Sequence, residues 1–306
     1  MTNAQYLKNL SVPEGPIDVI LDTDAFNEID DQYAISYLLT AGEKLRIKGL
    51  CAAPFFNHHS DSPAQGMERS YQEICKLLKL AEREELIPAV YRGSTDYLKD
   101  EVTPQPSDAA DFMAATAMEY CPEKPLYIVA IGAITNVASA ILKNPEMVKN
   151  TVVVWLGGNG LHTHFRWSEF NMVQDIAAAR VIFGCGVPLV QLPCGGIVDH
   201  FTTTRPELEY WLKGKNPLCD YLVEKAIDEA ERYAAGKPWS RVIWDVTAVA
   251  WLLNDGERFL ESELIPSPIP EYDNSYSSDP ERHLIRYVTA IHRDALFADL
   301  FGRLGE

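Results

Sequence analysis

The chain of 306 residues carries a formal net charge of −17 at neutral pH, and 47% of its residues are hydrophobic. This composition is typical of a soluble globular protein with a large core, and we expect residues 1–306 to form a single domain. The negative charge argues against binding to nucleic acid, whose phosphates require a basic surface, and against binding to an anionic membrane. It is compatible with a neutral small-molecule substrate.

The cysteines and the apolar runs of the sequence indicate the cellular compartment of the protein. The six cysteines form no CxxC pair, which predicts buried apolar side chains in a reducing compartment rather than disulfides or zinc ligands. The N-terminus has no apolar core of signal-peptide length, and no run approaches the roughly eighteen apolar residues of a membrane span. We therefore expect a cytoplasmic protein.

Short runs typical of β-strands alternate with stretches of helical apolar spacing. We expect strands over 18–21, 46–52, 89–91, 126–131, 151–155, 188–192 and 284–288, and helices over 64–81, 107–119, 135–143, 175–183, 217–233, 245–253 and 291–304. The proline-rich stretch 266–270, with the polar residues after it, is interpreted as a surface excursion or a flap over a site. The alternation predicts an α/β fold with an open, mainly parallel sheet and helices on both faces.

An acidic loop directly follows the first predicted strand. Asp22, Asp24, Glu28, Asp30 and Asp31 fall within ten residues, and the apolar spacing after them predicts a helix that starts near Asp30. Clustered carboxylates repel one another, and a hard divalent cation such as Ca²⁺ or Mg²⁺ would explain their proximity. The helix dipole tolerates negative charge at its N-terminus. The open alternative is an acidic surface turn that only caps the helix.

Two further turns follow predicted strands. The run Ile131-Gly132-Ala133-Ile134-Thr135-Asn136 is either a tight strand–helix turn or a source of a backbone carbonyl for a metal shell. Later, Gly157-Gly158 precede Glu169 and Asn171, which are two residues apart and would project to the same side of an extended segment. A carboxylate and an amide placed together can hydrogen-bond the vicinal hydroxyls of a sugar. A surface loop with an aromatic anchor is the alternative.

The remaining candidates are Trp244-Asp245 and the histidines. Asp245 precedes an apolar helix and is interpreted as an N-cap or as a ligand to something charged, and Trp244 as a core residue or as a stacking surface for a flat heterocycle. His58 and His59 follow a strand and could line the same cleft, and His162 and His164 lie in the loop before Glu169. We interpret each of the four as a polar loop residue, because none has metal-ligand spacing such as HExxH.

Taken together and in this order, these segments resemble the inosine-uridine preferring nucleoside hydrolase family. The family's DxDxGxDD motif resembles residues 22–31, its T/x-G-x-L-T-N turn resembles residues 131–136, its M-G-G…E-F-N pattern resembles residues 156–171, and its H/W-D pair resembles residues 244–245. The resemblance implies an open α/β fold, one Ca²⁺ ion and hydrolysis of an N-glycosidic bond to free ribose and a nucleobase. It also implies a homodimer or homotetramer.

The resemblance also implies a role for each matching residue. The Ca²⁺ ligands would be Asp24, Asp31, the Ile131 carbonyl and Asp245, and Asp24 would act as the general base on a calcium-bound water. The ribose hydroxyls would be held by Asp30, Asn57, Glu169, Asn171 and Asp245, with Asp22 supporting the loop from behind. A ring of carboxylates would stabilise a ribosyl cation and repel a 5′-phosphate, which favours nucleosides over nucleotides.

The chain departs from the family pattern in two places. Five residues separate Asp24 from Asp30 where the family has three, so the loop must bulge, and Asn27 or Glu28 is positioned to intrude on the sugar site. Trp244 stands where many members have a histidine that protonates the leaving base. Because tryptophan cannot donate that proton, Trp244 resembles the purine-selective branch, in which stacking activates the base. We therefore expect a preference for purine nucleosides.

Three alternatives stay open from the sequence. A haloacid-dehalogenase-like phosphohydrolase also has DxD after its first strand and binds Mg²⁺, but it usually has Thr or Val where this chain has Phe26. A calcium- or sugar-binding member of the fold would have lost activity when the first loop lengthened. A hydrolase of a different N-ribosyl or C-ribosyl compound would result if the longer loop reshaped the pocket.

Overall fold

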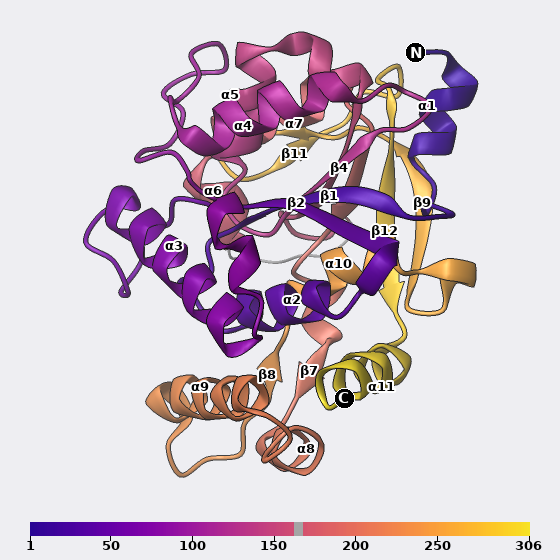
Figure 1. Ribbon diagram of the computed structural model, residues 1–306. Coiled ribbons are helices and arrows are strands. Elements are labelled where there is room, and N and C mark those ends of the chain that lie inside the picture. The colour runs from indigo at the N-terminus through magenta and orange to yellow at the C-terminus, as the bar shows by residue number, and fades with distance from the viewer. Residues whose placement is uncertain (162–167) are drawn as a thin grey trace.

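A mainly parallel sheet organises the chain in this computed structural model, which describes residues 1–161 and 168–306 (Figure 1). Within those residues the central sheet has eight strands in the order β3-β2-β1-β4-β5-β6-β12-β9. The strands are β1 Ile17–Thr23, β2 Leu45–Ala52, β3 Val90–Arg92, β4 Leu126–Ala130, β5 Thr151–Leu156, β6 Leu189–Leu192, β9 Leu260–Pro266 and β12 Leu284–Ile291. Neighbouring strands are parallel except β9, which pairs antiparallel with β12 at one edge.

Helices cover both faces of the sheet, as the alternating pattern predicts (Figure 1). One apolar layer contains α2 Asp30–Leu39, α3 Pro63–Leu80, α9 Pro217–Ala234, α10 Val246–Leu252 and α11 Arg293–Leu304. The other contains α4 Asp108–Thr116, α5 Thr135–Lys143 and α7 Ile176–Gly184. The predicted α/β fold class is confirmed. None of the described helices is long and apolar enough to cross a membrane.

The predicted elements match the structure closely in the first two thirds of the chain and less well afterwards. The predicted helix 107–119 ends its α-helical part at Thr116, because its last turn tightens into a 3-10 helix. The predicted helix 291–304 starts at Arg293, because β12 runs to Ile291. The prediction missed the following short or edge elements: α1 Asn3–Asn9, α6 Phe170–Gln174, β7 Thr202–Thr203, α8 Arg205–Trp211, β8 Arg241–Val242, β9, β10 Ile269–Pro270 and β11 Tyr276–Ser277.

The segment interpreted as a surface excursion or flap is partly strand. β9 ends at Pro266, and β10 then pairs with β11 in a small antiparallel ladder. Prolines at strand ends and on short ladders are tolerated because they need not donate to a neighbour. The apolar pattern of β9 is weak because most of its side chains are exposed.

The sheet places several loops at one edge. The carboxyl ends of β1, β4, β5 and β6 are neighbours, since these strands are adjacent and parallel. Open α/β sheets bind their ligands at this edge. The segment before α10 reaches the same edge because α10 packs against α2, the helix that follows β1.

Candidate active site

Four buried aspartates meet at the carboxyl end of β1. Asp24 follows the strand, Asp30 and Asp31 begin α2, and Asp245 immediately precedes α10. Carboxylate oxygens of Asp30, Asp31 and Asp245 all lie within 4.8 Å of one another. The structure therefore brings together residues from both ends of the chain that the sequence motifs had placed in one site.

Asp24 lies beside this group with its charge uncompensated. Both of its carboxylate oxygens are fully buried and have no hydrogen-bond partner among the described residues. Its side chain lies against Gly132, where an added Cβ would come within 2.8 Å of Asp24 Oδ1. Glycine at position 132 thus leaves the space that the Asp24 carboxylate occupies.

Burial and mutual repulsion raise the pKa of these carboxyls. Burial raises the pKa of Asp24 well above its usual range, and the charges of Asp31 and Asp30 raise it further. The pKa of Asp31 rises to about 8 through burial and the charge of Asp30, although the Thr23 hydroxyl donates a 2.5 Å hydrogen bond to it. The pKa of Asp245 rises through burial and through Asp30 and Asp31. At neutral pH the cluster is costly to ionise unless a cation compensates it.

The donor set fits a hard divalent cation. Asp24, Asp30, Asp31 and Asp245 supply only oxygen atoms, the ligands that Ca²⁺ and Mg²⁺ take in proteins. The buried Ile131 carbonyl accepts a 3.1 Å hydrogen bond from Asn171 Nδ2 and keeps its second lone pair. This residue set, with Asp24 unpartnered among the described residues, fits a divalent cation.

Asp22 lies one step behind the cluster. Its Oδ1 accepts a 2.8 Å hydrogen bond from Asn136 Nδ2, and the same amide group donates to the Ala52 carbonyl at 3.2 Å. Asn136 Oδ1 accepts in turn from the backbone N–H of Ser94 at 2.8 Å. Asp22 therefore joins β1 to α5 and to the end of β2, which agrees with a supporting role.

Glu169 and Asn171 form the wall that faces the aspartates. Glu169 caps α6, because its carboxylate accepts hydrogen bonds from the backbone N–H groups of Gly158, Asn171 and Met172 at 2.7–2.8 Å. Asn171 Nδ2 donates to the carbonyls of Ile131 and Leu156. The sequence pattern predicted an extended segment here and missed α6, whose short helical turn fixes both side chains through backbone contacts.

The long first loop folds back towards the site, as its two extra residues predict. The Asn27 N–H donates to the Asp24 carbonyl at 2.7 Å, and Gln32 Nε2 holds the turn through the Ala25 carbonyl at 2.8 Å. Asn27 and Glu28 both reach the cavity wall, whereas Phe26 contacts the ring of His59 instead. Both residues that we expected to intrude thus line the cavity, and their effect on a bound sugar stays a prediction.

Asn57, which we expected to bind the sugar, lies behind Asn27 as seen from the cavity. Its amide donates a 2.5 Å hydrogen bond to Asn27 Oδ1, and its own Oδ1 accepts from the His59 N–H at 2.8 Å. The longer loop thus places Asn27 between Asn57 and the cavity. The role of Asn57 as a direct sugar ligand stays a prediction.

Glu28 is paired across the loop with Arg241, the first residue of β8. The Arg241 guanidinium donates to Glu28 Oε2, and its carbon lies 5.5 Å from the centre of the Trp244 ring. Burial raises the pKa of Glu28 to about 7, while Arg241 acts in the opposite direction. The ion pair therefore joins the acidic loop to the segment that carries Trp244 and Asp245.

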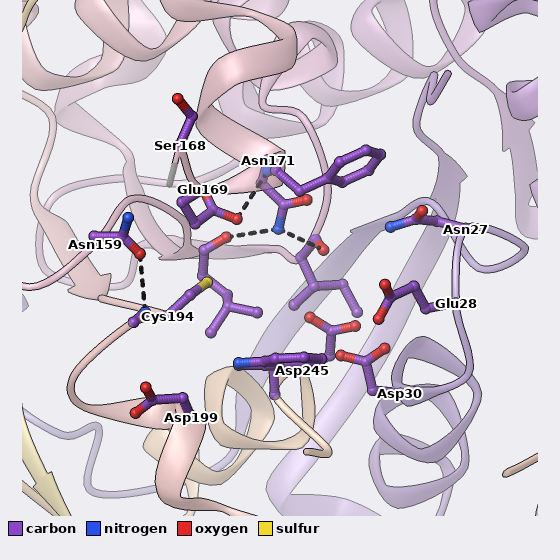
Figure 2. Close-up of a pocket in the computed structure, with 15 residues that line it drawn as sticks. Asn27, Glu28, Asp30, Asn159, Ser168, Glu169, Asn171, Cys194, Asp199 and Asp245 are labelled. Carbon is purple, nitrogen blue, oxygen red and sulfur yellow. Dashed lines mark hydrogen bonds between the residues drawn. The ribbon is translucent and has the colours of Figure 1, made fainter. Parts of the chain in front are cut away.

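These elements enclose a cavity of about 230 Å³ (Figure 2). Its lining includes Asn27, Glu28, Asp30, Ile131, Leu156, Asn159, Ser168, Glu169, Phe170, Asn171, Cys194, Gly195, Asp199, Trp244 and Asp245. Sequence reasoning predicted Glu169 and Asn171 after β5 but assigned no role to Ser168 or to the residues after β6, which are Cys194, Gly195 and Asp199. Their position at the carboxyl ends of parallel strands is the only signal that would have found them.

His58 and His59 do not line this cavity. His58 and His59 lie instead beside Glu229 of α9, with Nε2–Oε1 distances of 4.0 and 3.7 Å. His162 and His164 lie outside the described residues. His58 and His59 therefore do not line the cleft, because the longer first loop fills the intervening space with Phe26 and Asn27, and their interpretation as polar loop residues is the one that fits.

Known proteins share both the sequence pattern and the fold. The RihA pyrimidine-specific ribonucleoside hydrolase of Salmonella agona is 27% identical over 263 residues, which cover 78% of this chain and 79% of the relative. A plant nucleoside hydrolase, PpNRh1, superposes with a TM-score of 0.75 at 21% identity and covers 95% of this chain and 99% of its own. A purine-preferring ribonucleoside hydrolase from Gardnerella vaginalis superposes with a TM-score of 0.74 at 19% identity and covers 94% and 98%. Residues 19–290 match the family described as inosine-uridine preferring nucleoside hydrolase, so the chain with this acidic site belongs to that family of N-ribosyl hydrolases.

Proposed function

We propose that this protein hydrolyses the N-glycosidic bond of ribonucleosides to ribose and free base with the aid of one Ca²⁺ ion. The ion would be held by Asp24, Asp31, the Ile131 carbonyl and Asp245. The observation that carries the proposal is the Asp24 carboxylate, which is fully buried without a hydrogen-bond partner among the described residues and interacts with the charges of Asp30, Asp31 and Asp245. The carboxyls of such a site ionise together at neutral pH without a large energetic cost only when a cation is bound.

The residues divide the chemical work. When bound, the cation lowers the pKa of a water molecule and orders it for attack. Asp24 has no competing hydrogen bond among the residues that the structure describes, and it acts as the general base that accepts the proton. Asp30 and Asp245 carry negative charge next to the sugar and stabilise the positive charge that develops on the ribosyl ring as the base leaves.

The ribose is held between two walls. Asp30 and Asp245 accept from its vicinal hydroxyls on one side. On the other side Asn171 offers its amide oxygen, because its Nδ2 is committed to two backbone carbonyls. Glu169 reaches the sugar with the lone pairs left over from its helix-capping contacts, and Asn57 acts through Asn27 or directly. The acidic lining disfavours a 5′-phosphate, so nucleosides are the substrate class.

Trp244 supports a preference for purine nucleosides. Its indole lines the cavity, and it cannot donate a proton to a leaving base in the way a histidine does. A purine offers a larger surface for stacking than a pyrimidine, and an aromatic pair contributes about 0.5–1.5 kcal/mol beyond its buried area. The relatives named above include a pyrimidine-specific and a purine-preferring enzyme, so the residue at position 244 of this chain carries the argument.

The test is release of free base from purified protein. Inosine, adenosine, guanosine, uridine and cytidine are supplied with Ca²⁺ and then with a chelator, beside Asp24→Ala and the matched control Asp18→Ala. Asp18 lies at the opposite end of β1 and pairs with Arg46 at the surface, so its loss leaves the cavity intact.

We expect calcium-dependent base release by the wild type and by Asp18→Ala, and its loss in Asp24→Ala. Equal turnover of uridine and inosine would contradict the purine preference alone. Calcium and ribose binding without hydrolysis of any ribonucleoside would instead support the alternative of a binding protein or a different ribosyl substrate.

A further inference from the structure

The cavity has two chemically different ends. Figure 2 shows Asn159 and Asp199 at one end and Asn27 and Glu28 at the other, with Asp30 and Asp245 between them at its base. A ribose whose 2′- and 3′-hydroxyls lie over the aspartates carries the base at C1′ and the hydroxymethyl group at C4′. These two substituents point towards different ends of the cavity. One end of the cavity therefore receives the 5′-hydroxymethyl group, and the other receives the base.

Trp244 identifies the end that receives the base. Arg241 contacts both Glu28, through its guanidinium, and the Trp244 ring, whose centre lies 5.5 Å from the guanidinium carbon. Glu28 and the indole therefore share one buried neighbour, Arg241. The indole is a flat apolar surface on which a base can stack, and a base that turns its edge towards Arg241 would lie next to the Glu28 carboxylate.

Glu28 can still accept hydrogen bonds there. Its side chain is 38% exposed, whereas that of Arg241 is only 9% exposed. Arg241 engages Oε2, and no donor among the described residues reaches Oε1. Figure 2 shows the Glu28 carboxylate directed into the cavity beside Asp30. The buried guanidinium offsets the charge of Glu28 and holds the carboxylate in one orientation.

We infer that Glu28 reads the edge of the leaving base and favours bases with two adjacent N–H donors, as in guanine. A carboxylate has two oxygens and no donor, so it matches the imino N–H and the 2-amino group of guanine as a pair. Hypoxanthine lacks that amino group and offers only one of the two donors. The inference rests on the proposed function, because it assumes a ribonucleoside in the cavity.

The longer first loop is the origin of this contact. The two residues beyond the family pattern bring Glu28 to the wall, where Gln32 Nε2 supports the loop through the Glu28 carbonyl at 3.3 Å. The specificity that we assign to Glu28 is therefore a property of this chain's own loop, and the residues that hold the cation and the ribose do not provide it.

The experiment compares guanosine with inosine, which differ only by the 2-amino group. We expect the wild type to favour guanosine in kcat/KM by about tenfold or more, the usual effect of a hydrogen bond to a charged group. Glu28→Gln keeps the shape of the side chain but replaces one acceptor with a donor. It should lower the guanosine-to-inosine ratio by about tenfold, mainly through KM for guanosine.

The control variant is Glu68→Gln, which breaks a comparable ion pair, Glu68–Arg92, on the surface of α3. It should leave the guanosine-to-inosine ratio unchanged. An equal wild-type preference for the two nucleosides, or a ratio that Glu28→Gln does not move, overturns the inference. The wild-type comparison decides the question even if Glu28→Gln does not fold.

A separate measurement distinguishes this inference from the proposed function. If the wild type releases base from neither nucleoside, the proposed function fails, and calorimetry then measures guanosine and inosine binding to the intact protein. Tighter binding of guanosine, lost in Glu28→Gln, still supports the role of Glu28. Equal binding of the two nucleosides rejects it.

Discussion

Asp31 and Asp245 place carboxylate oxygens within 4.8 Å of each other although more than two hundred residues separate them in the chain. The packing of α10 against α2 creates this proximity, because each aspartate stands at the start of one of these helices. Two like charges at buried helix starts oppose folding. This arrangement costs local stability, and the cation that we propose would offset the cost.

Calcium should stabilise the protein more strongly at high pH than at low pH. The carboxyl pKa of Asp31 rises from an ordinary value of 3.8 to about 8, and those of Asp24 and Asp245 also rise. The folded metal-free chain then binds more protons than the unfolded chain between about pH 4 and pH 8, so its stability falls as the pH rises through that window. A bound cation removes this penalty. Thermal unfolding with chelator and with Ca²⁺ at pH 5 and pH 8 measures the effect, and an equal calcium-induced shift at both pH values would contradict it.

Replacement of Asp31 by Asn should have opposite effects with and without calcium. The amide removes a buried charge, so the metal-free variant should unfold at a higher temperature than the metal-free wild type. With calcium the order should reverse, because a ligand is lost, and kcat/KM should fall by at least about a hundredfold. Melting curves with and without chelator, together with base release, check this. A variant that is less stable in both conditions would indicate a purely structural role for Asp31.

Much of the site could be predicted from the sequence, because its charged residues lie in short ordered motifs. The end of a predicted strand, the start of a predicted helix and a family motif were enough to assign Asp24, Asp31 and Asp245 to one site. The structure brings these residues together. Asn57 shows where such reasoning stops. Whether it faces the cavity depends on the path of the longer loop, which now places Asn27 in front of it.

The contacts that sequence reasoning missed depend on three-dimensional geometry. The capping role of Glu169 required the short helix α6, whose few residues carry no clear periodicity. Asp199 and Cys194 follow β6 in a loop without a recognisable motif and reach the cavity only because β6 lies beside β5. The Glu28–Arg241 pair joins segments that are distant in sequence and have no pattern in common.

Gly132→Ala should weaken calcium binding although position 132 supplies no ligand side chain. The added Cβ would lie 2.8 Å from Asp24 Oδ1, which is closer than carbon and oxygen normally approach, so the carboxylate must shift. Displacement of groups that orient metal ligands typically costs 10–100-fold in affinity, and we expect about that loss in a calcium titration. Gly15→Ala is the matched control, since nothing lies within 4 Å of its added Cβ. Equal calcium affinity in the two variants would show that Asp24 does not bind the ion.

Trp244→His should shift the protein towards pyrimidine nucleosides. The substitution removes the stacking surface and supplies an imidazole, which protonates a leaving base near neutral pH. General acid catalysis contributes about 10²–10⁴-fold, and uridine, whose base leaves poorly without a proton, benefits more than inosine. We expect the ratio of kcat/KM for uridine to that for inosine to rise by at least about tenfold, measured by base release. Trp244→Phe keeps a stacking ring without an acid and should preserve the purine preference. A Trp244→His variant that loses both substrates equally would show that the indole is needed only for packing against Arg241, whose guanidinium carbon lies 5.5 Å from the centre of the ring.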